Sequence, residues 1–172
     1  WGLPVNGRIT QFFGAAGCGK SFMALLMCKA TLEKYPDSEV LYVDTEQAVD
    51  VKWMKRLGID TSRVRIMSTN SGKEIWDALC GRYNKDGKKN QQGILDFVAA
   101  KQLNIKLIVL DSIADMQPTL EQGRNIEQAE MAPLPRFLSR GLRMLRPMLA
   151  KAGVGLLCIN HLRDGMDGGP PQ

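Results

Sequence analysis

Residues 14–21 constrain the fold of this chain more than any other feature, because they form a complete phosphate-binding loop. The loop reads Gly14, Ala15, Ala16, Gly17, Cys18, Gly19, Lys20 and Ser21. It fits the pattern GxxxxGK[ST] and stands between an apolar run, residues 9–13, and a stretch of helical character, residues 20–34. Glycines allow backbone amides to point inward at phosphate oxygens, and the start of a helix favours an anion. The sequence therefore predicts a site for the triphosphate of a nucleotide such as ATP, together with Mg²⁺.

Two side chains of the loop are expected to act on the nucleotide. Lys20 places a positive charge against the β and γ phosphates, and Ser21 offers its hydroxyl to Mg²⁺. We interpret Cys18 as a small residue that fits the loop. None of the four cysteines is spaced as a metal pair, so we expect reduced thiols in a cytoplasmic protein.

Short apolar runs alternate with amphipathic stretches along the chain. The runs are rich in β-branched or aromatic residues and too short for helices, so strands are predicted at residues 9–13, 40–43, 64–67, 107–110 and 154–159. Helices are predicted at residues 20–34, 47–57, 71–83, 91–102 and 135–152. This alternation indicates a doubly wound sheet. We therefore expect an α/β P-loop NTPase fold, with a mostly parallel central β-sheet flanked by helices.

The segments between these elements carry weaker signals. Residues 84–90 are polar and basic, which favours a solvated loop, with a nucleic-acid contact as the lesser alternative. Residues 113–131 lack periodicity and predict a long, mobile loop, and residues 164–172 are rich in Gly and Pro and predict disorder. No apolar run reaches the ~20 residues that a membrane span needs.

Three polar residues follow predicted strands at the edge where ligands bind in such folds. Asp111 ends residues 107–110 in the manner of a Walker B strand, which predicts a contact with Mg²⁺. Glu46 follows residues 40–43 and can orient and deprotonate the water that attacks the γ phosphate, although a carboxylate stabilised at a helix start is an equal alternative. His161 closes the last strand at this edge, where it can sense the γ phosphate.

The predicted helix at residues 135–152 has an apolar side and a basic side. Arg136, Arg140 and Arg143 follow the spacing i, i+4, i+7 and share one face. Such a stripe is usually a solvated face, and contact with a phosphate backbone is the alternative. Pro147 is expected to kink or divide this helix. Ser71 and Glu74 have the spacing of a capping box at the start of the helix predicted at residues 71–83.

In order and spacing, these pieces resemble the RecA family of homologous-recombination ATPases, including its phage UvsX-type members. The resemblance extends over nearly all 172 residues, and beyond the phosphate-binding loop it rests on residues 2–4, 7–9, 44–50, 57–60, 111–112 and 159–161. It implies one RecA-like ATPase core domain over residues 1–172, incomplete and ending near the second DNA-binding loop of the family.

The resemblance also implies roles for single residues. Glu46 stands where the family has its catalytic glutamate, and Asp50 and Trp53 match positions that contact the adenine by hydrogen bond and by stacking. Residues 117–131 correspond to the first DNA-binding loop. Arg136 and Arg143 match two arginines that approach the DNA backbone.

One departure is that bacterial members have glutamine where this chain has His161, and a second is that residues 81–93 form a longer segment than theirs. The resemblance implies a DNA-dependent ATPase that forms an ATP-bound homo-oligomeric filament on single-stranded DNA and promotes pairing and strand exchange with homologous duplex DNA. It also implies a cytoplasmic location, in a bacterial cell or a phage-infected host, without a membrane partner. A hexameric helicase of the same fold and a regulatory nucleotide-binding module without DNA activity are the alternatives.

Overall fold

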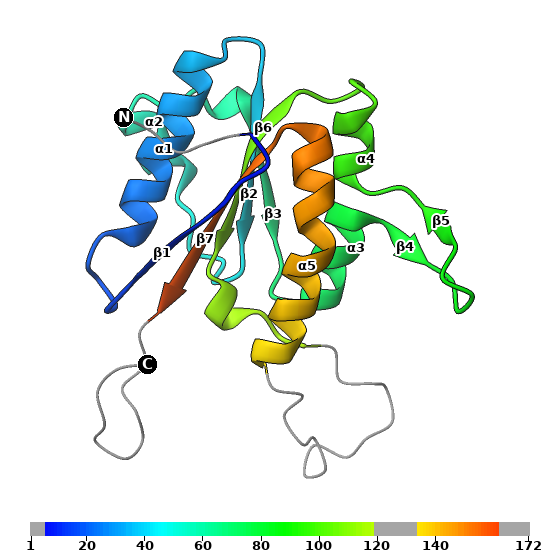
Figure 1. The fold of residues 1–172 in the computed structure, drawn as a ribbon. Helices are drawn as coiled ribbons and strands as arrows, with labels where there is room; N and C mark the ends of the chain where they lie inside the picture. Colours follow the sequence, from blue (N-terminus) through cyan, green and yellow to red (C-terminus); the bar gives the residue numbers. More distant parts are fainter. Residues whose placement is uncertain (1–5, 119–133, 162–172) are drawn as a thin grey trace, which may run out of the picture.

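The computed structural model describes residues 6–118 and 134–161, and its centre is a five-stranded parallel sheet (Figure 1). The strand order is β1-β7-β6-β2-β3. The strands are β1 (Ile9–Gly14), β2 (Glu39–Asp44), β3 (Val64–Ser68), β6 (Ile105–Asp111) and β7 (Gly155–His161). All five strands predicted from the apolar runs are present, so the expectation of a parallel α/β sheet is confirmed.

Burial of the strands follows their place in the sheet. The central strands β2 and β6 are buried along almost their whole length, whereas the edge strands β1 and β3 have exposed residues throughout. A strand covered on both faces needs apolar side chains on both, which explains the uninterrupted apolar runs.

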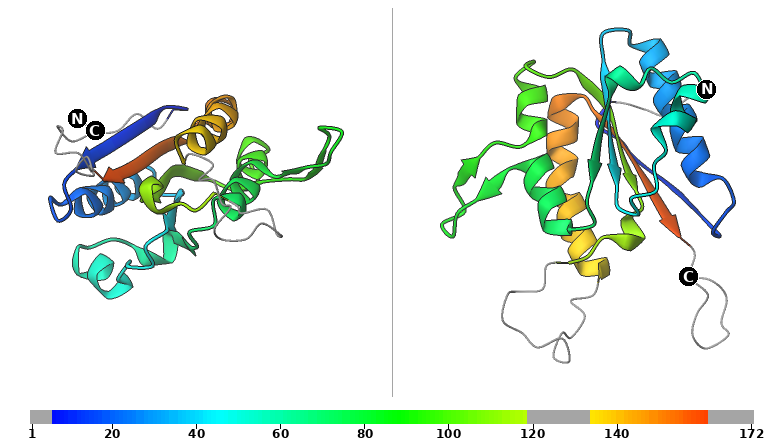
Figure 2. Two further views of the ribbon diagram at one scale, coloured as in Figure 1. Left: turned by 90° about the horizontal axis from the view of Figure 1, so that it is seen from below. Right: turned by 180° about the vertical axis from the view of Figure 1, so that it is seen from behind.

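Helices cover both faces of the sheet (Figure 2). On one face, α1 (Lys20–Lys34) and α2 (Val51–Arg56) pack over a cluster that includes Leu25, Leu32, Met54 and Val109. On the other, α3 (Gly72–Cys80), α4 (Ile94–Ala99) and α5 (Leu134–Ala152) pack over a second cluster that includes Ile75, Leu79, Leu145 and Leu149. None of the described helices is long and apolar enough to cross a membrane.

The strand register brings functional positions to one edge. Asp44 of β2 lies beside Asp111 of β6, and Gly14 of β1 lies beside His161 of β7. Because all strands run in the same direction, their carboxyl ends share this edge, which is where open α/β sheets bind ligands.

The helix predicted at residues 47–57 begins later than expected. The Asp44 carboxylate accepts the amides of Ala48 at 3.2 Å and Val49 at 2.9 Å, which holds this segment in a turn. Gln47 takes a positive φ of 56°, which a right-handed helix excludes. The helix α2 therefore starts after Asp50, whose carboxylate accepts the Lys52 amide at 2.7 Å as an N-cap.

The segment between α3 and α4 is more ordered than predicted. The helix predicted to run to residue 83 stops at Gly81, whose φ of +83° favours glycine. Strands β4 (Arg82–Tyr83) and β5 (Lys89–Gln91) then pair as an antiparallel hairpin that projects from the body in Figure 1. The expectation of a plain solvated loop at residues 84–90 was therefore wrong in part, and α4 starts only after the hairpin.

Two further details differ from expectation. The capping box at α3 is only half formed: Ser71 accepts the Glu74 amide at 3.4 Å, but the Glu74 carboxylate accepts the Thr69 hydroxyl at 2.7 Å. Pro147 does not divide α5, which runs unbroken from Leu134 to Ala152. Pro147 lies on the exposed side of α5. Proline has no amide hydrogen, so the carbonyl group one turn earlier lacks its helical donor, and water can bind that carbonyl instead.

The long loop predicted at residues 113–131 begins with a short 3-10 helix, η2 (Ile113–Asp115). The rest of that prediction from residue 119, and the predicted disorder at 164–172, lie outside the described residues.

Candidate nucleotide-binding and hydrolysis site

The phosphate-binding loop joins the end of β1 to the start of α1. Gly17 and Gly19 have φ values of +74° and +89°, and a Cβ built on either would meet no atom within 4 Å. These positions therefore require glycine for backbone conformation rather than for space. Gly19 is the N-cap of α1, so the free amides at the start of this helix lie next to the loop.

Lys20 folds back over the loop that precedes it. Its Nζ donates to the carbonyl oxygens of Gly14 at 3.0 Å and Ala15 at 2.8 Å, and it lies 3.9 Å from the Cys18 Sγ. Lys20 is 8% exposed. Its charge therefore stands over the inner surface of the loop, where the phosphates of a nucleotide would need it.

Asp111 presents a buried carboxylate beside this loop. Its Oδ2 accepts the Tyr42 hydroxyl at 2.5 Å, and its Oδ1 is buried without a hydrogen-bond partner among the described residues. Burial raises the pKa of Asp111, and the hydroxyls of Tyr42 and Ser21 beside the carboxylate lower it. A buried oxygen without a donor is costly unless a cation satisfies it. The pair Ser21 and Asp111 therefore fits a Mg²⁺ ion through oxygen ligands.

Thr45 joins the ends of β2 and β6 and fixes the start of the turn that carries Glu46. Its Oγ1 donates to the Ser112 carbonyl at 2.8 Å and accepts the Ser112 amide at 2.7 Å, and its own amide donates to the Asp111 carbonyl at 2.8 Å. All three residues are buried. These bonds hold the backbone next to Glu46 at a fixed distance from Asp111.

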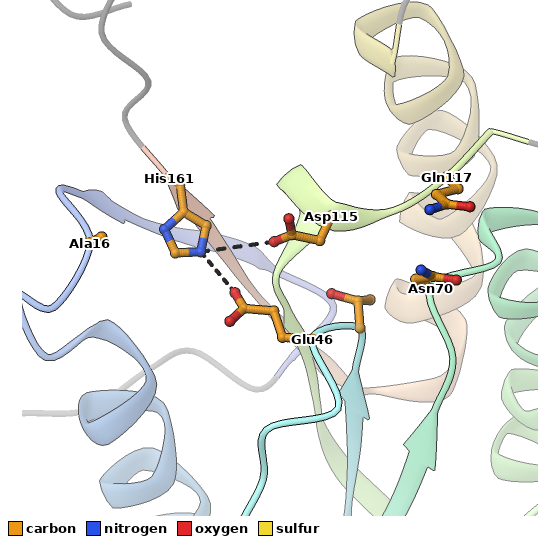
Figure 3. A pocket seen from close by; sticks show the side chains of 7 residues that line it. Ala16, Glu46, Asn70, Asp115, Gln117 and His161 are labelled. Atoms are coloured by element: carbon orange, nitrogen blue, oxygen red, sulfur yellow. Dashed lines mark hydrogen bonds and ion pairs between the residues drawn. The ribbon is translucent and has the colours of Figure 1, made fainter.

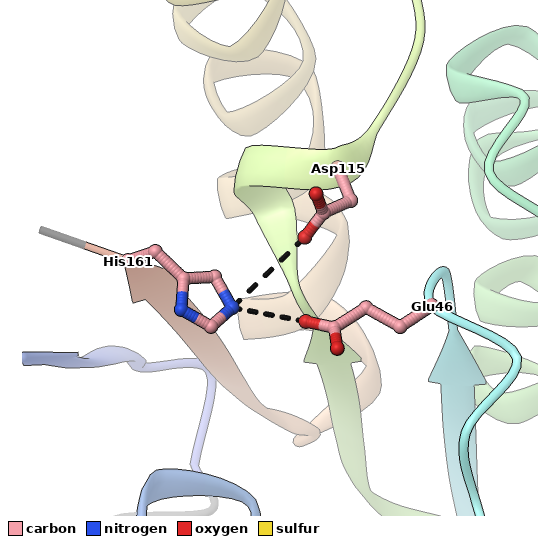
Figure 4. A group of neighbouring side chains, drawn as sticks. All are labelled: Glu46, Asp115 and His161. Carbon is pink, nitrogen blue, oxygen red and sulfur yellow. Dashed lines mark hydrogen bonds and ion pairs between the residues drawn. The ribbon is translucent and has the colours of Figure 1, made fainter. Parts of the chain in front are cut away.

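Glu46 and His161 meet in a polar cavity at the carboxyl edge of the sheet. The cavity has a volume of about 600 Å³ and is lined by Ala16, Thr45, Glu46, Asn70, Asp115, Gln117 and His161 (Figure 3). The His161 Nε2 lies 2.9 Å from the Glu46 Oε1 and 4.0 Å from the Asp115 Oδ2 (Figure 4). Since Ala16 belongs to the phosphate-binding loop, this cluster faces the space that the terminal phosphate would enter.

Trp53, the predicted adenine contact, lies next to the helix that follows the phosphate-binding loop. Its ring stacks on Phe22 with centroids 5.8 Å apart and an angle of 25° between the planes. Trp53 remains 37% exposed, so part of its ring is free to stack on a base. Asp50 caps α2 and lies 3.9 Å from the Arg56 guanidinium, so its carboxylate already has local partners.

Trp53 is expected to report nucleotide binding by its fluorescence. Stacking of a purine on the exposed part of the ring would change the emission of the indole. Titration of an ATP analogue into the wild-type protein and into Trp53→Phe tests this, because the substitution leaves Trp1 and Trp76 in place. A response of equal size in the mutant would rule out stacking on Trp53.

Arg136 and Arg143 lie on the exposed side of α5, about two helical turns apart. Arg140, between them, lines a second cavity of about 450 Å³ between α3 and α5. The opposite side of α5 packs on the sheet through Leu145 and Leu149, as predicted. The two arginines are thus exposed to a ligand, while their predicted contact with DNA stays a prediction.

The structure brings most of the predicted site residues to one edge of the sheet and adds others that the sequence did not suggest. The phosphate-binding loop, Glu46, Asp111 and His161 lie together, whereas Arg136 and Arg143 lie on a separate surface of α5. The added residues are Phe22, Tyr42, Thr45 and Asp115. In the sequence, only the position of Asp115, four residues after Asp111, indicated that it belongs to this site.

The chain is similar to known proteins over most of its length. The family model described as the RecA N-terminal domain matches residues 1–169. The chain is 30% identical to Protein RecA of Ureaplasma parvum serovar 3 and 27% identical to Protein RecA of Aquifex aeolicus, covering 95% of this chain in both cases. It spans 43% and 41% of those two proteins, less than half of their length.

Proposed function

The chain belongs to the RecA family, and from this premise we propose that it is the core of a DNA-dependent ATPase that acts in homologous recombination. The observation that carries the proposal is the shared sheet edge, where the phosphate-binding loop, Asp111, Glu46 and His161 converge. Each group has the chemistry that transfer of the γ phosphate from ATP to water requires.

Each of these residues has a separate role in hydrolysis. Lys20 exchanges its two carbonyl contacts for phosphate oxygens and neutralises their charge. Ser21 and Asp111 would hold Mg²⁺, which would shield the negative charge of the β and γ phosphates. Glu46 accepts a proton from the attacking water, and the His161 ring senses the charge of the γ phosphate.

The partners belong to the same proposal. We expect the protein to form a helical filament on single-stranded DNA in the presence of ATP and to pair that strand with homologous duplex DNA. A hexameric helicase would use the same sheet edge in a closed ring. A regulatory nucleotide-binding module would hydrolyse ATP without any response to DNA.

Two measurements test the proposal. ATP turnover of the full-length protein is measured with and without single-stranded DNA, and the complex with an ATP analogue and DNA is viewed by electron microscopy. A helical filament and DNA-stimulated turnover are expected. Closed rings with unwinding activity would favour the helicase, and turnover indifferent to DNA would favour the regulatory module.

The double substitution Arg136→Ala, Arg143→Ala is expected to weaken binding of single-stranded DNA without regard to its sequence. If both guanidinium groups bind phosphates, the slope of log affinity against log salt falls by about 0.7 for each phosphate that is no longer neutralised. Affinity is measured at several salt concentrations, and the thermal midpoint checks folding.

Arg8→Ala with Lys34→Ala is the matched control, since it removes the same charge from two exposed residues, before β1 and in the last turn of α1. If the two double variants bind DNA with the same affinity and salt slope, Arg136 and Arg143 are exposed to solvent and do not bind DNA.

A further inference from the structure

Asp115 offers the imidazole of His161 a second acceptor, in competition with Glu46. We infer that Asp115 is a positioning residue for hydrolysis: it takes over the His161 Nε2 when nucleotide is bound and thereby releases Glu46 to activate water. The inference rests on the proposed role of Glu46 in ATP hydrolysis. It goes beyond that role because it assigns a function to a carboxylate outside the phosphate-binding loop and the metal pair.

The competition arises because one nitrogen faces two carboxylates. The His161 Nε2 lies 2.9 Å from the Glu46 Oε1 and 4.0 Å from the Asp115 Oδ2 (Figure 4). Nε2 carries at most one proton and makes one strong hydrogen bond at a time. In the arrangement observed, that bond belongs to Glu46.

In the structure, one carboxylate oxygen of Glu46 is engaged by the imidazole of His161. A general base must reach the water whose proton it takes. Contact with His161 therefore withholds Glu46 from catalysis, and hydrolysis requires that the contact is broken.

Asp115 is held more firmly than Glu46. The Ser112 hydroxyl donates to its Oδ2, its backbone amide donates to the Ser112 carbonyl at 3.3 Å, and Ile113 anchors the same short helix η2 in the core. The side chains of Glu46 and Asp115 are about equally exposed, 41% and 39%, so the contacts with Ser112 are what distinguish them. Asp115 is thus the more fixed carboxylate, and the Glu46 side chain has room to turn toward a water molecule.

The change required of His161 is small. A hydrogen bond between nitrogen and oxygen needs about 2.7–3.2 Å, so Nε2 must approach Asp115 by roughly 1 Å. His161 is the last residue of β7, where the chain leaves the sheet, and its ring faces the cavity that Ala16 also lines. The negative charge of a nucleotide that enters this cavity acts directly on Glu46, Asp115 and His161.

The first test is kinetic. Asp115→Asn is expected to lower kcat for ATP about tenfold with little change in KM, a smaller loss than removal of Glu46 itself. Asparagine keeps an oxygen that can accept the Ser112 hydroxyl. If Asp115→Asn does not fold, Asp115→Ala serves as a second variant that lacks the carboxylate. Asp86→Asn, in the turn between β4 and β5, is the charge-matched control.

The second test follows the imidazole itself by ¹⁵N NMR. His161 is the single histidine of these 172 residues, and comparison with His161→Gln assigns its ring signals. Without nucleotide, Glu46→Gln should shift these signals more than Asp115→Asn does. With Mg²⁺ and a non-hydrolysable ATP analogue, Asp115→Asn should cause the larger shift.

The outcomes separate this inference from the proposed function. A kcat for Asp115→Asn equal to that of Asp86→Asn overturns the inference, and so does an unchanged order of the NMR shifts after the analogue binds. If Glu46→Gln turns over ATP at the wild-type rate, the proposed role of Glu46 fails instead.

Discussion

Replacement of Lys20 by alanine is expected to reduce ATP hydrolysis by roughly 10³-fold or to background and to weaken triphosphate binding. In the structure the ammonium group contacts the carbonyl oxygens of Gly14 and Ala15 and lies over the loop. No other lysine or arginine belongs to residues 14–21. Without Lys20, the phosphates would rely on Mg²⁺ and on backbone amides, which carry only partial charges.

The control for Lys20→Ala is Lys34→Ala, which removes an exposed lysine from the last turn of the same helix. Its turnover should equal that of the wild type. Thermal midpoints show whether Lys20→Ala still folds, since the substitution also removes both hydrogen bonds of Lys20 to the loop. Normal turnover by a folded Lys20→Ala protein would mean that residues 14–21 are not the site of hydrolysis.

The fold could be predicted from sequence because its strands are buried on both faces. Residues 107–110 and 40–43 are apolar without alternation, and they became the central strands β6 and β2. Since parallel strands present their carboxyl ends at one edge, the residues after them had to meet there. That geometric rule alone brings Gly14, Asp111 and His161 together.

Other features depend on contacts that no local pattern encodes. The start of α2 is set by the Asp44 carboxylate, which accepts two amides and delays the helix to Val51. The hairpin of β4 and β5 has only two and three residues in its strands, too few for an alternating pattern. Asp115 reaches His161 because η2 turns the chain back after β6, a turn without a clear signal in the sequence.

Glu46→Gln is expected to keep ATP binding and to reduce turnover by roughly 10²-fold or more, the usual loss when a general base is removed. Glutamine keeps the shape of the side chain but accepts a proton poorly. The Thr45 contacts with Ser112 and Asp111 stay intact, so the turn that carries residue 46 should hold its place. A fall in kcat with unchanged affinity would mark an interaction made only in the transition state.

The equal alternative from the sequence was that Glu46 stabilises the start of a helix. The structure weakens this alternative, since α2 begins only at Val51 and its cap is Asp50. If Glu46 were structural, Glu46→Gln would lower the thermal midpoint and ATP affinity while the residual turnover of the folded fraction stayed normal. Binding of an ATP analogue, single-turnover hydrolysis and thermal unfolding, each compared with Glu33→Gln on the exposed side of α1, distinguish the two roles. A selective loss of the chemical step would assign the proton transfer to Glu46.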